Sequence, residues 1–567
     1  MKKKPPPKLI HVDRLNQYVA EVQSGVRPAN KWEKLAVDRH VADLARVVDD
    51  DWPYLFDAVD VERRCRRAEL WHHTKGRWAA KHQTIKMEGW QCFIMGSIFG
   101  WKRKTDKRRR FREAYIECGR KNGKSLTAAA IGLEMFLFDG EYGAEVYAGA
   151  TSEKQAWYVF EPARRMLMHD EEIRTQMGVT VAAKALVREE DRSTFQPVIG
   201  KPGDGASPHC AIADEFHEHI TSDLVDTMTT GMLAREQPLM LYVTTAGDNA
   251  AGPCYAKRDE VCQMLDQSSP NERLFGIIFT IDETDDWASP DVLLKANPNL
   301  GVSFDLEGLL ADQRRAKETP VKQAAFKTKH LNVWVGALNG LINIQRWRFL
   351  ADPALHPSQF AGEDCWFGVD LASTSDLCAV VKLFRKEVND RPHYYGFLRC
   401  YLPEKAIEDT KANHAVYANA IEKGSLVVTP GATCDYDCIL DDIDEEARQF
   451  NPQKLVFDPF NARHFGELVR QKGIEVVECE QIVKNIAVPT DQLIGIITDG
   501  RFHHNGDAFF QWQVGNVVGK TGRKGLMMPA KGQQSHKKID GFQALVMAMK
   551  YAFADEEVGT SGDLVTA

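Results

Sequence analysis

The pattern of hydrophobic and polar positions in the first half of the chain predicts short strands that alternate with helices. Apolar runs that end in polar or glycine-bearing turns are typical of buried strands, and they occur at 114–116, 144–150, 210–213 and 239–243. Between them, 126–138 and 153–169 carry apolar residues at helical spacing. This alternation predicts an α/β domain with a parallel sheet, whose ligands bind at the carboxyl ends of the strands.

A second group of strands follows, after a stretch that loses this periodicity. Residues 336–357 gain Gly, Asn and Pro and are interpreted as a linker. The expected organisation is an N-terminal helical segment at 1–60, an α/β domain at 61–335, the linker at 336–357, a second domain at 358–555 and a disordered tail at 556–567.

Composition fits a folded protein with more than one core. The 567 residues exceed what one hydrophobic core usually serves. The net charge of −8 argues against a protein that coats nucleic acid through overall positive charge, so any such contact must come from local basic patches. The twelve cysteines lack paired metal-ligand spacing and are interpreted as reduced thiols. We find no signal peptide, and the longest largely apolar segment, 90–101, is shorter than the about 20 residues that span a bilayer.

The turn between the predicted strand 114–116 and the helix 126–138 has the chemistry of a phosphate-binding loop. Its sequence is Gly119-Arg120-Lys121-Asn122-Gly123-Lys124-Ser125. Backbone N–H groups of such a loop bind phosphates, the lysine contacts the β/γ oxygens, and the serine hydroxyl joins a Mg²⁺ ion. The loop departs from the usual pattern, because Cys118 stands where glycine is expected and Gly119 comes one residue late. The sequence nevertheless predicts a site for ATP with Mg²⁺.

Two further strand ends add the residues that hydrolysis requires. The strand 210–213 runs into Asp214 and Glu215. We expect Asp214 to hold Mg²⁺ through water and Glu215 to polarise the attacking water. Thr245, after the strand 239–243, is placed to sense the γ-phosphate.

Two features upstream of the loop each allow two interpretations. Gln91, beside Trp90 and Phe93, could read the adenine edge, but a helix with buried aromatic residues and a solvated glutamine fits equally well. The basic run 102–112 could be a solvated loop or a contact with DNA phosphates. Its position ahead of the strand 114–116 predicts that it lies at the edge of the sheet opposite the nucleotide.

Three widely spaced aspartates indicate a metal site in the second domain. Asp370 and Asp458 end apolar runs, and Asp540 begins a helical run. Each alone could be an ordinary cap, but together they match the plan of ribonuclease H-like nucleases, in which two Mg²⁺ or Mn²⁺ ions activate water and stabilise the leaving oxygen. Lys531, His536, Lys537 and Lys538 add positive charge nearby that could hold a DNA backbone or simply be solvated.

Taken as a set, these motifs resemble those of the large terminase subunit of tailed bacteriophages, particularly the group that includes phage HK97. The resemblance covers almost the whole chain. It rests on the loop 119–125, Asp214-Glu215, 244–247, Ala296-Asn297-Pro298-Asn299-Leu300-Gly301, 368–371 with Asp376, and 538–541.

This resemblance implies an N-terminal P-loop ATPase domain that moves DNA into an empty capsid and a C-terminal ribonuclease H-like domain that cuts concatemeric DNA. Arg120 resembles the family's arginine that stabilises charge on the γ-phosphate, and Gln91 its adenine-reading glutamine. Asp370, Asp458 and Asp540 align with the metal triad, and Asp376 is an auxiliary ligand or a supporting acid. For Asp458, the nearby acids Asp435, Asp437 and 441–444 remain alternatives.

The resemblance also implies partners. These are double-stranded DNA, a small terminase subunit, the portal protein of the procapsid and further copies of the chain in a pentameric ring, with no membrane. The expected location is the host cytoplasm during infection and not the mature virion. One alternative is a helicase-nuclease, but such enzymes usually carry a second motor domain and we find no second P-loop. Another is a virion docking protein with relic sites, which the intact Lys124, Glu215 and three aspartates argue against.

Overall fold

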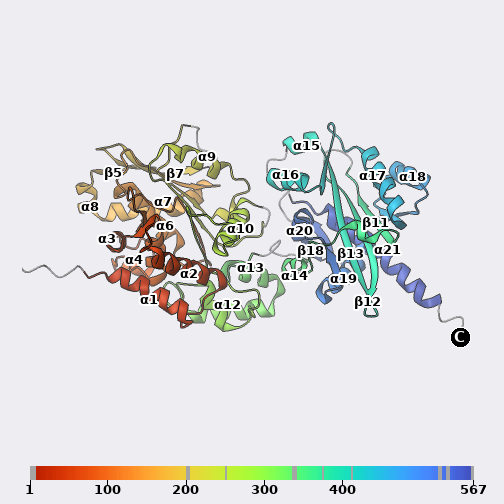
Figure 1. Cartoon of the computed structure of the whole chain (residues 1–567), viewed down its shortest axis with the longest axis horizontal. Coiled ribbons are helices and arrows are strands. Elements are labelled where there is room, and N and C mark those ends of the chain that lie inside the picture. The colour runs from red at the N-terminus through yellow and green to blue at the C-terminus, as the bar shows by residue number, and fades with distance from the viewer. Residues whose placement is uncertain are drawn as a thin grey trace, which may run out of the picture. The chain divides into compact units, whose positions relative to one another are not determined.

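The computed structural model describes residues 8–199, 205–249, 252–334, 341–372, 376–409, 413–460, 462–521, 527–531 and 537–562. The chain divides into two compact units (Figure 1). Unit 1 comprises Met1–Gly247 and Gly252–Trp334, and unit 2 comprises Asp248–Ala251 and Val335–Ala567. Unit 1 therefore includes the N-terminal helices that the sequence pattern sets apart as 1–60. Within the described ranges, no helix is both long and apolar enough to cross a membrane.

Unit 1 is built on an eight-stranded sheet with the order β10-β3-β9-β8-β4-β7-β6-β5 in the part of the chain described. Neighbouring strands from β10 to β7 are parallel, whereas β6 and β5 are antiparallel additions at one edge. The parallel sheet predicted from the sequence is confirmed. The strands of unit 1 are β1 (Tyr54–Phe56), β2 (Trp101–Arg103), β3 (Glu113–Glu117), β4 (Glu145–Ala150), β5 (Val179–Val181), β6 (Leu186–Arg188), β7 (Ser193–Ile199), β8 (Cys210–Asp214), β9 (Leu239–Thr244) and β10 (Leu274–Ile278).

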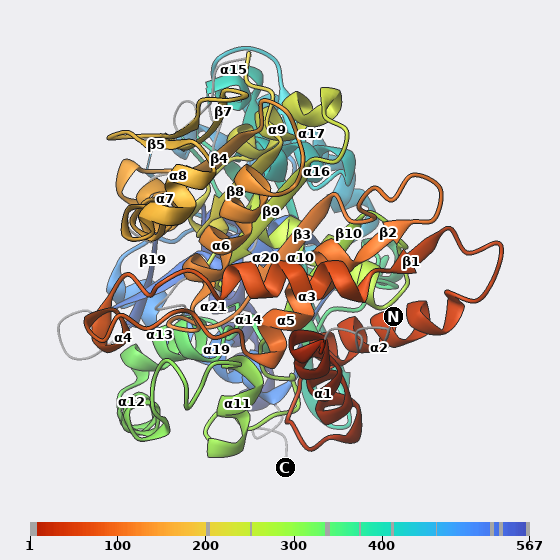
Figure 2. The same cartoon turned by 90° about the vertical axis from the view of Figure 1, so that its left-hand side faces the viewer.

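Helices cover this sheet and bury its apolar side chains. The alanine-rich helix α6 packs on β8, β9 and β4, since small side chains let it approach the strands closely, and α7 packs on β7 (Figure 2). The helices of unit 1 are α1 (Ile10–Ser24), α2 (Lys31–Arg46), α3 (Ala58–Ala68), α4 (Gly76–Ala80), α5 (Gly89–Met95), α6 (Lys124–Leu137), α7 (Glu153–His169), α8 (Glu171–Gln176), α9 (Asp223–Gly231), α10 (Pro253–Leu265), α11 (Leu293–Ala296), α12 (Leu306–Glu318) and α13 (Pro320–His330).

The basic run 102–112 is largely neutralised inside unit 1. Arg109 and Arg110 are buried, and they pair with Asp139 at 2.9 Å and with Asp43 at 2.6 Å. Neither interpretation from the sequence fits these two arginines, because they are neither solvated nor open to DNA. The charge density of the run reflects internal ion pairs with acids distant in sequence.

Unit 2 contains a seven-stranded sheet among its described residues, with the order β14-β13-β12-β11-β15-β16 and with β17 beside β13. The centre is antiparallel between β11, β12 and β13, and β11 pairs in parallel with β15. The strands of unit 2 are β11 (Asp364–Asp370), β12 (Cys378–Val388), β13 (Arg391–Pro403), β14 (Leu426–Thr429), β15 (Asn451–Phe457), β16 (Val476–Glu478), β17 (Phe502–His504), β18 (Val517–Thr521) and β19 (Met527–Lys531).

The long helix α21 packs on β11 and β12 at the centre of this sheet. It brings Asp540, its first residue, to the end of β11 where Asp370 lies. The helices of unit 2 are α14 (Ile344–Phe349), α15 (Glu404–Asp409), α16 (His414–Glu422), α17 (Tyr436–Gln449), α18 (Arg463–Gln471), α19 (Val483–Asp499), α20 (Ala508–Gly515) and α21 (Asp540–Gly562).

Two expected boundaries differ from the structure. Much of the predicted linker 336–357 belongs to the core of unit 2, because Trp347 of α14 is fully buried and stacks on His504 and Phe502. Residues 336–340 lie outside the described residues. The tail expected to be disordered from 556 instead continues α21 as far as Gly562, and 563–567 lie outside the described residues.

Candidate active sites

The predicted phosphate-binding loop connects β3 to α6 at the carboxyl end of the parallel strands. Gly123 adopts a left-handed backbone (φ 80°), and no side chain caps the first turn of α6. The N–H groups of that turn are therefore available to an anion. The Lys124 ammonium lies across the loop, where it donates to the carbonyl oxygen of Cys118 at 3.0 Å and to Thr245 Oγ1.

The predicted acids lie beside this loop. Ser125 Oγ is 3.4 Å from Asp214 Oδ2, at the end of β8. Burial, together with the charge of Glu215, raises the pKa of Asp214 to about 7. A Mg²⁺ ion between Ser125 and Asp214 would hold this carboxylate ionised, so the oxygen donors present fit a hard divalent cation.

Glu215 stands in a strained left-handed conformation (φ 47°), which is uncommon for a residue with a side chain. Its Oε2 lies 3.3 Å from Nδ1 of His217, and that nitrogen lies 3.1 Å from Thr244 Oγ1. His217 thus connects the acid to the strand end that precedes Thr245. The sequence carries one local signal for this contact, a histidine two positions after Glu215.

Arg120 and Gln91 differ in how free their side chains are. The Arg120 side chain is exposed and donates no hydrogen bond within the described part of the chain. In contrast, Gln91 is buried, with Nε2 donating to Thr127 Oγ1 (2.9 Å) and Oε1 accepting from the Glu88 N–H (3.0 Å). Each bond uses one donor and one acceptor of the Gln91 amide, which leaves a second N–H and a second lone pair for another partner.

In unit 2, two of the predicted metal-binding aspartates meet in one cleft. Asp370 and Asp540 line a cleft of about 460 Å³ together with Asp376, Lys531 and Gln543. Burial and the charge of Asp540 raise the pKa of Asp370 well above its usual value. Burial also raises the pKa of Asp540, and its Oδ2 is buried with no hydrogen-bond partner in the structure described. Such an orphaned carboxylate oxygen fits a cation ligand.

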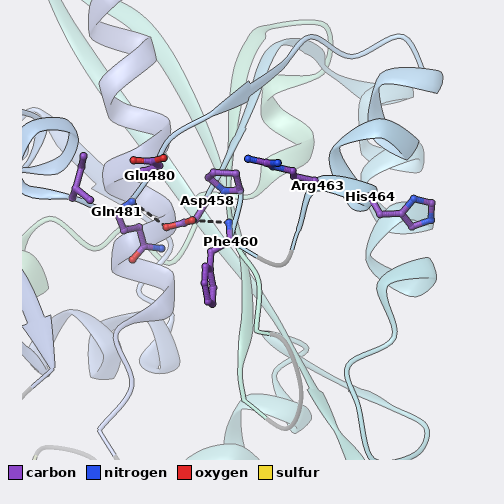
Figure 3. Close-up of a pocket in the computed structure, with 8 residues that line it drawn as sticks. Asp458, Phe460, Arg463, His464, Glu480 and Gln481 are labelled. Carbon is purple, nitrogen blue, oxygen red and sulfur yellow. Dashed lines mark hydrogen bonds between the residues drawn. The ribbon is translucent and has the colours of Figure 1, made fainter.

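Asp458 lies in an adjoining pocket of about 720 Å³ at the end of β15 (Figure 3). Its two oxygens accept from the N–H groups of Phe460 (2.9 Å) and Gln481 (3.0 Å). The Gln481 side chain donates to Asp370 Oδ1 at 2.8 Å, so one residue joins the two acids. Sequence reasoning missed Gln481, which sits in no motif.

The other acids considered for the place of Asp458 have different roles. Asp435 caps α17, Asp442 accepts from the Tyr401 hydroxyl, and Asp444 pairs with Arg448. Asp437 and Asp441 are exposed, and Asp458 is the acid that Gln481 joins to Asp370.

Two lysines neutralise the remaining acid of the cleft. Burial would raise the pKa of Asp376, but the Lys538 ammonium outweighs burial and lowers it. Lys531 Nζ lies 3.8 Å from both Asp376 and Asp540. Lys531 thus lies among the acids themselves, while His536 falls outside the described residues. Among those residues, no three His, Cys, Asp or Glu side chains are gathered closely enough to hold a metal ion without rearrangement.

Two family models match the chain. The terminase large subunit ATPase domain matches residues 89–262, and the terminase large subunit endonuclease domain matches residues 270–556. The second match begins before the end of unit 1, so it covers the α11–α13 segment as well as unit 2.

Individual proteins are also similar. Protein YmfN of Escherichia coli is 40% identical over 395 residues, covering 68% of this chain and 86% of that protein. The terminase large subunit of Enterobacteria phage HK97 is 25% identical over 463 residues, covering 80% of this chain and 89% of its own. The crystal structure of the HK97 bacteriophage large terminase aligns with a TM-score of 0.45 and 22% identity, covering 87% of this chain and 99% of that one.

Proposed function

The chain belongs to the terminase large subunit family, and we propose that the loop 119–125 is the ATP site of its packaging motor and that Asp370, Asp458 and Asp540 form the metal site of its nuclease. The protein is an ATPase and a nuclease of viral DNA packaging and cleavage. The observation that supports the motor site most directly is the meeting of Lys124 and Ser125 with Asp214 and Glu215 at one end of the sheet.

In the motor site, each residue has its own role in ATP hydrolysis. The N–H groups from Gly123 to Ser125 bind phosphate oxygens, and Lys124 neutralises their charge. Ser125 and Asp214 would hold Mg²⁺, which shields the phosphates when bound. Glu215 orients and accepts a proton from the attacking water, while the Arg120 guanidinium is free to stabilise charge on the γ-phosphate. We also assign contacts with the nucleotide to Lys121, Thr245, Gln91 and the backbone N–H of Asn122, while Gly119 shapes the loop around them.

In the nuclease site, Asp370, Asp458 and Asp540 would hold two Mg²⁺ or Mn²⁺ ions, with Asp376 as an auxiliary ligand or a supporting acid. The ions supply Lewis acidity at the scissile phosphate when bound. Gln481 keeps Asp370 and Asp458 oriented toward each other. Burial and the repulsion of Asp540 together raise the pKa of Asp370, and a cation between the two acids would relieve that repulsion.

The partners proposed for this motor are double-stranded DNA, a small terminase subunit and the portal protein of a procapsid. We propose a pentameric ring during packaging, because force must pass between subunits around the duplex. We place the protein in the host cytoplasm during infection and outside the mature virion.

The test measures ATP hydrolysis with and without double-stranded DNA, beside plasmid cleavage in Mg²⁺ and in Mn²⁺. Lys124→Ala should abolish hydrolysis only, and Asp370→Ala should abolish cleavage only. Glu215→Gln should abolish hydrolysis while ATP binding remains. The exposed residues Lys184 and Asp499 provide matched controls, Lys184→Ala and Asp499→Ala, which should change neither activity.

One result would refute the two-site proposal: loss of both activities in a folded protein with one substitution. A wild-type protein inactive in both assays, even with small terminase subunit and procapsids present, would favour the docking-protein alternative instead.

A further inference from the structure

Three buried asparagines connect the phosphate-binding loop to the turn 296–301. The Asn122 side chain donates to Asn297 Oδ1 at 2.9 Å and to the carbonyl oxygen of Gly119 at 3.0 Å. Its own Oδ1 accepts from the N–H of Asn299 at 2.9 Å. Asn122 and Asn297 are fully buried. Every one of these bonds joins the loop to itself or to the turn, so the Asn122 amide is not free for a nucleotide.

Hydrogen bonds also fix the turn 296–301 to the rest of unit 1. Asn297 Nδ2 donates to the carbonyl oxygens of Leu293 (2.9 Å) and His330 (2.7 Å). The loop is also held through Ser303, whose hydroxyl donates to the carbonyl oxygen of Lys121 at 2.7 Å. The clamp, which we define as Asn297 and Asn299 with Ser303, therefore holds the loop from outside.

The first half of the loop also uses its own N–H groups for this attachment. The Arg120 N–H donates to the carbonyl oxygen of Lys329 at 2.8 Å, and the Gly119 N–H points to that of Ala296 at 3.4 Å. Phosphate-binding loops ordinarily aim such groups at the ligand. Here the N–H groups of Gly119 and Arg120 face carbonyl oxygens of the protein instead. The first half of the loop therefore positions Arg120, and the second half binds phosphate.

The clamp also explains the late glycine of the loop. A Cβ at position 119 would lie 2.8 Å from Asn297 Oδ1 and 3.2 Å from the carbonyl oxygen of His330. Only glycine allows the turn to approach this closely. The unusual position of Gly119 thus follows from contact with Asn297, and needs no special contact with the nucleotide.

We infer that Asn297, acting through Asn122, is a positioning residue for ATP hydrolysis that sets the place of Arg120 at the γ-phosphate. This inference rests on the proposed role of Arg120. Without Asn297, the Asn122 side chain keeps only the N–H of Asn299 as a partner outside the loop, so the first half of the loop is held less firmly and can shift. The second half, with Gly123, Lys124 and the first turn of α6, should still bind the phosphates of ADP.

The experiment first measures the number of ADP-binding sites per chain and then the rate of ATP hydrolysis. Fluorescent ADP with Mg²⁺ is titrated into the full chain to give the number of sites and the Kd, and the ATPase kcat is then divided by that number. We expect Asn297→Ala to lower kcat per site at least tenfold while Kd for ADP stays within about threefold. Partial misfolding would reduce the number of sites and leave kcat per site unchanged. Asn271→Ala is the matched control. Asn271 precedes the first residue of β10, at the end of the sheet away from the phosphate-binding loop, and its variant should have the kcat per site and the Kd for ADP of the wild type.

Arg120→Ala and Gly119→Ala separate the inference from the function beneath it. If Arg120→Ala keeps the wild-type kcat per site, the proposed role of Arg120 is wrong. If Arg120→Ala loses activity but Asn297→Ala keeps kcat per site within twofold, the positioning role of Asn297 is refuted. Gly119→Ala should also lose activity, and adding Asn297→Ala should recover part of it, because the clash with Oδ1 is gone. Losses that simply multiply in the double variant would contradict contact between the two residues.

Discussion

At the scale of single residues, Gln481 joins two acids of the proposed nuclease site. It contacts Asp370 through its side chain and Asp458 through its backbone. Residues that orient metal ligands typically contribute about 10–100-fold in metal affinity or activity when mutated. We therefore expect Gln481→Ala to raise the Mn²⁺ concentration for half-maximal plasmid cleavage by about 10-fold or more. ATP hydrolysis in unit 1 should not change.

Two measurements check this expectation for Gln481. Mn²⁺ binding, followed directly by calorimetry, should weaken in parallel with cleavage. Gln471→Ala, at the exposed end of α18, is the control and should leave both unchanged. Unaltered Mn²⁺ binding with reduced cleavage would mean that Gln481 acts on DNA and not on the acids.

The residues that could be predicted from the sequence are those with a local signal. Lys124 and Ser125 follow a glycine at the start of a helix, and Asp214 and Glu215 end an apolar strand. Gln481 and the contact of Asn297 with Asn122 could not be predicted in this way, because each depends on residues more than 20 positions away that only folding brings together. The residue type of a glutamine or asparagine does not show which other side chain its amide holds in place.

At the scale of elements, the proposed nuclease site depends on how closely α21 packs on β11. A Cβ at Gly368 would lie 1.9 Å from the carbonyl oxygen of Ala544, so no side chain fits between strand and helix. Gly368→Ala should push α21 away from β11 and separate Asp540 from Asp370. We expect plasmid cleavage to fall at least 100-fold and the melting temperature of unit 2 to drop, while ATP hydrolysis stays normal.

Gly495→Ala is the matched control for this substitution. Gly495 lies within α19, and a Cβ there would meet nothing within 4 Å. Alanine favours a helix over glycine by about 0.8–1.0 kcal/mol, so this variant should be as stable as wild type or slightly more stable. Full cleavage by Gly368→Ala would show that the packing of α21 does not set the distance between the acids.

The buried pair of Arg109 and Asp139 has a structural role that can be measured. Burial would raise the pKa of Asp139, but Arg109 and His209 outweigh it and hold the pKa well below the usual range. Removing one partner of a buried ion pair costs about 3–5 kcal/mol, so Asp139→Asn should destabilise unit 1 by that order at pH 7. Chemical denaturation of the full chain measures this, with Asp106→Asn in the exposed part of the run as the control.

The difference in unfolding free energy between wild type and Asp139→Asn should depend on pH. Because the pKa of Asp139 is lower in the folded chain than in the unfolded one, its stabilisation is complete above about pH 5 and is lost as the pH falls below about 4. The gap between wild type and Asp139→Asn should therefore narrow on acidification. A gap that stays constant from pH 7 to pH 3 would mean that the charge of Asp139 contributes little.

Element types could be predicted from periodicity, but two boundaries could not. In the predicted linker, Gly, Asn and Pro interrupt the periodic pattern, so the pattern did not indicate that Ile344 and Trp347 pack into unit 2. At the other end, α21 continues to Gly562, although residues 556–567 are small and acidic and lack periodic apolar positions. Periodicity averages over a window, so it detects long buried elements better than short ones or helix ends.

At the scale of the whole molecule, the two activities lie in separately packed parts of one chain. Each unit has its own sheet and its own buried core, and each holds the residues of one proposed site. The division into two units could be predicted from length and from the interrupted pattern near 340. Which acids face each other could not, because the sequence does not state the strand order.

This division predicts that ligands stabilise the two units independently. A ligand that binds only the folded form at 100 times its Kd adds about 2.7 kcal/mol to stability. ADP with Mg²⁺, compared with Mg²⁺ alone, should therefore raise the melting transition of unit 1 in scanning calorimetry and leave that of unit 2 in place. Lys124→Ala should remove the shift, and Gly368→Ala should lower only the other transition. A single transition that moves with both changes would mean that the units unfold as one body, and that a substitution in one site could then disturb the other through stability alone.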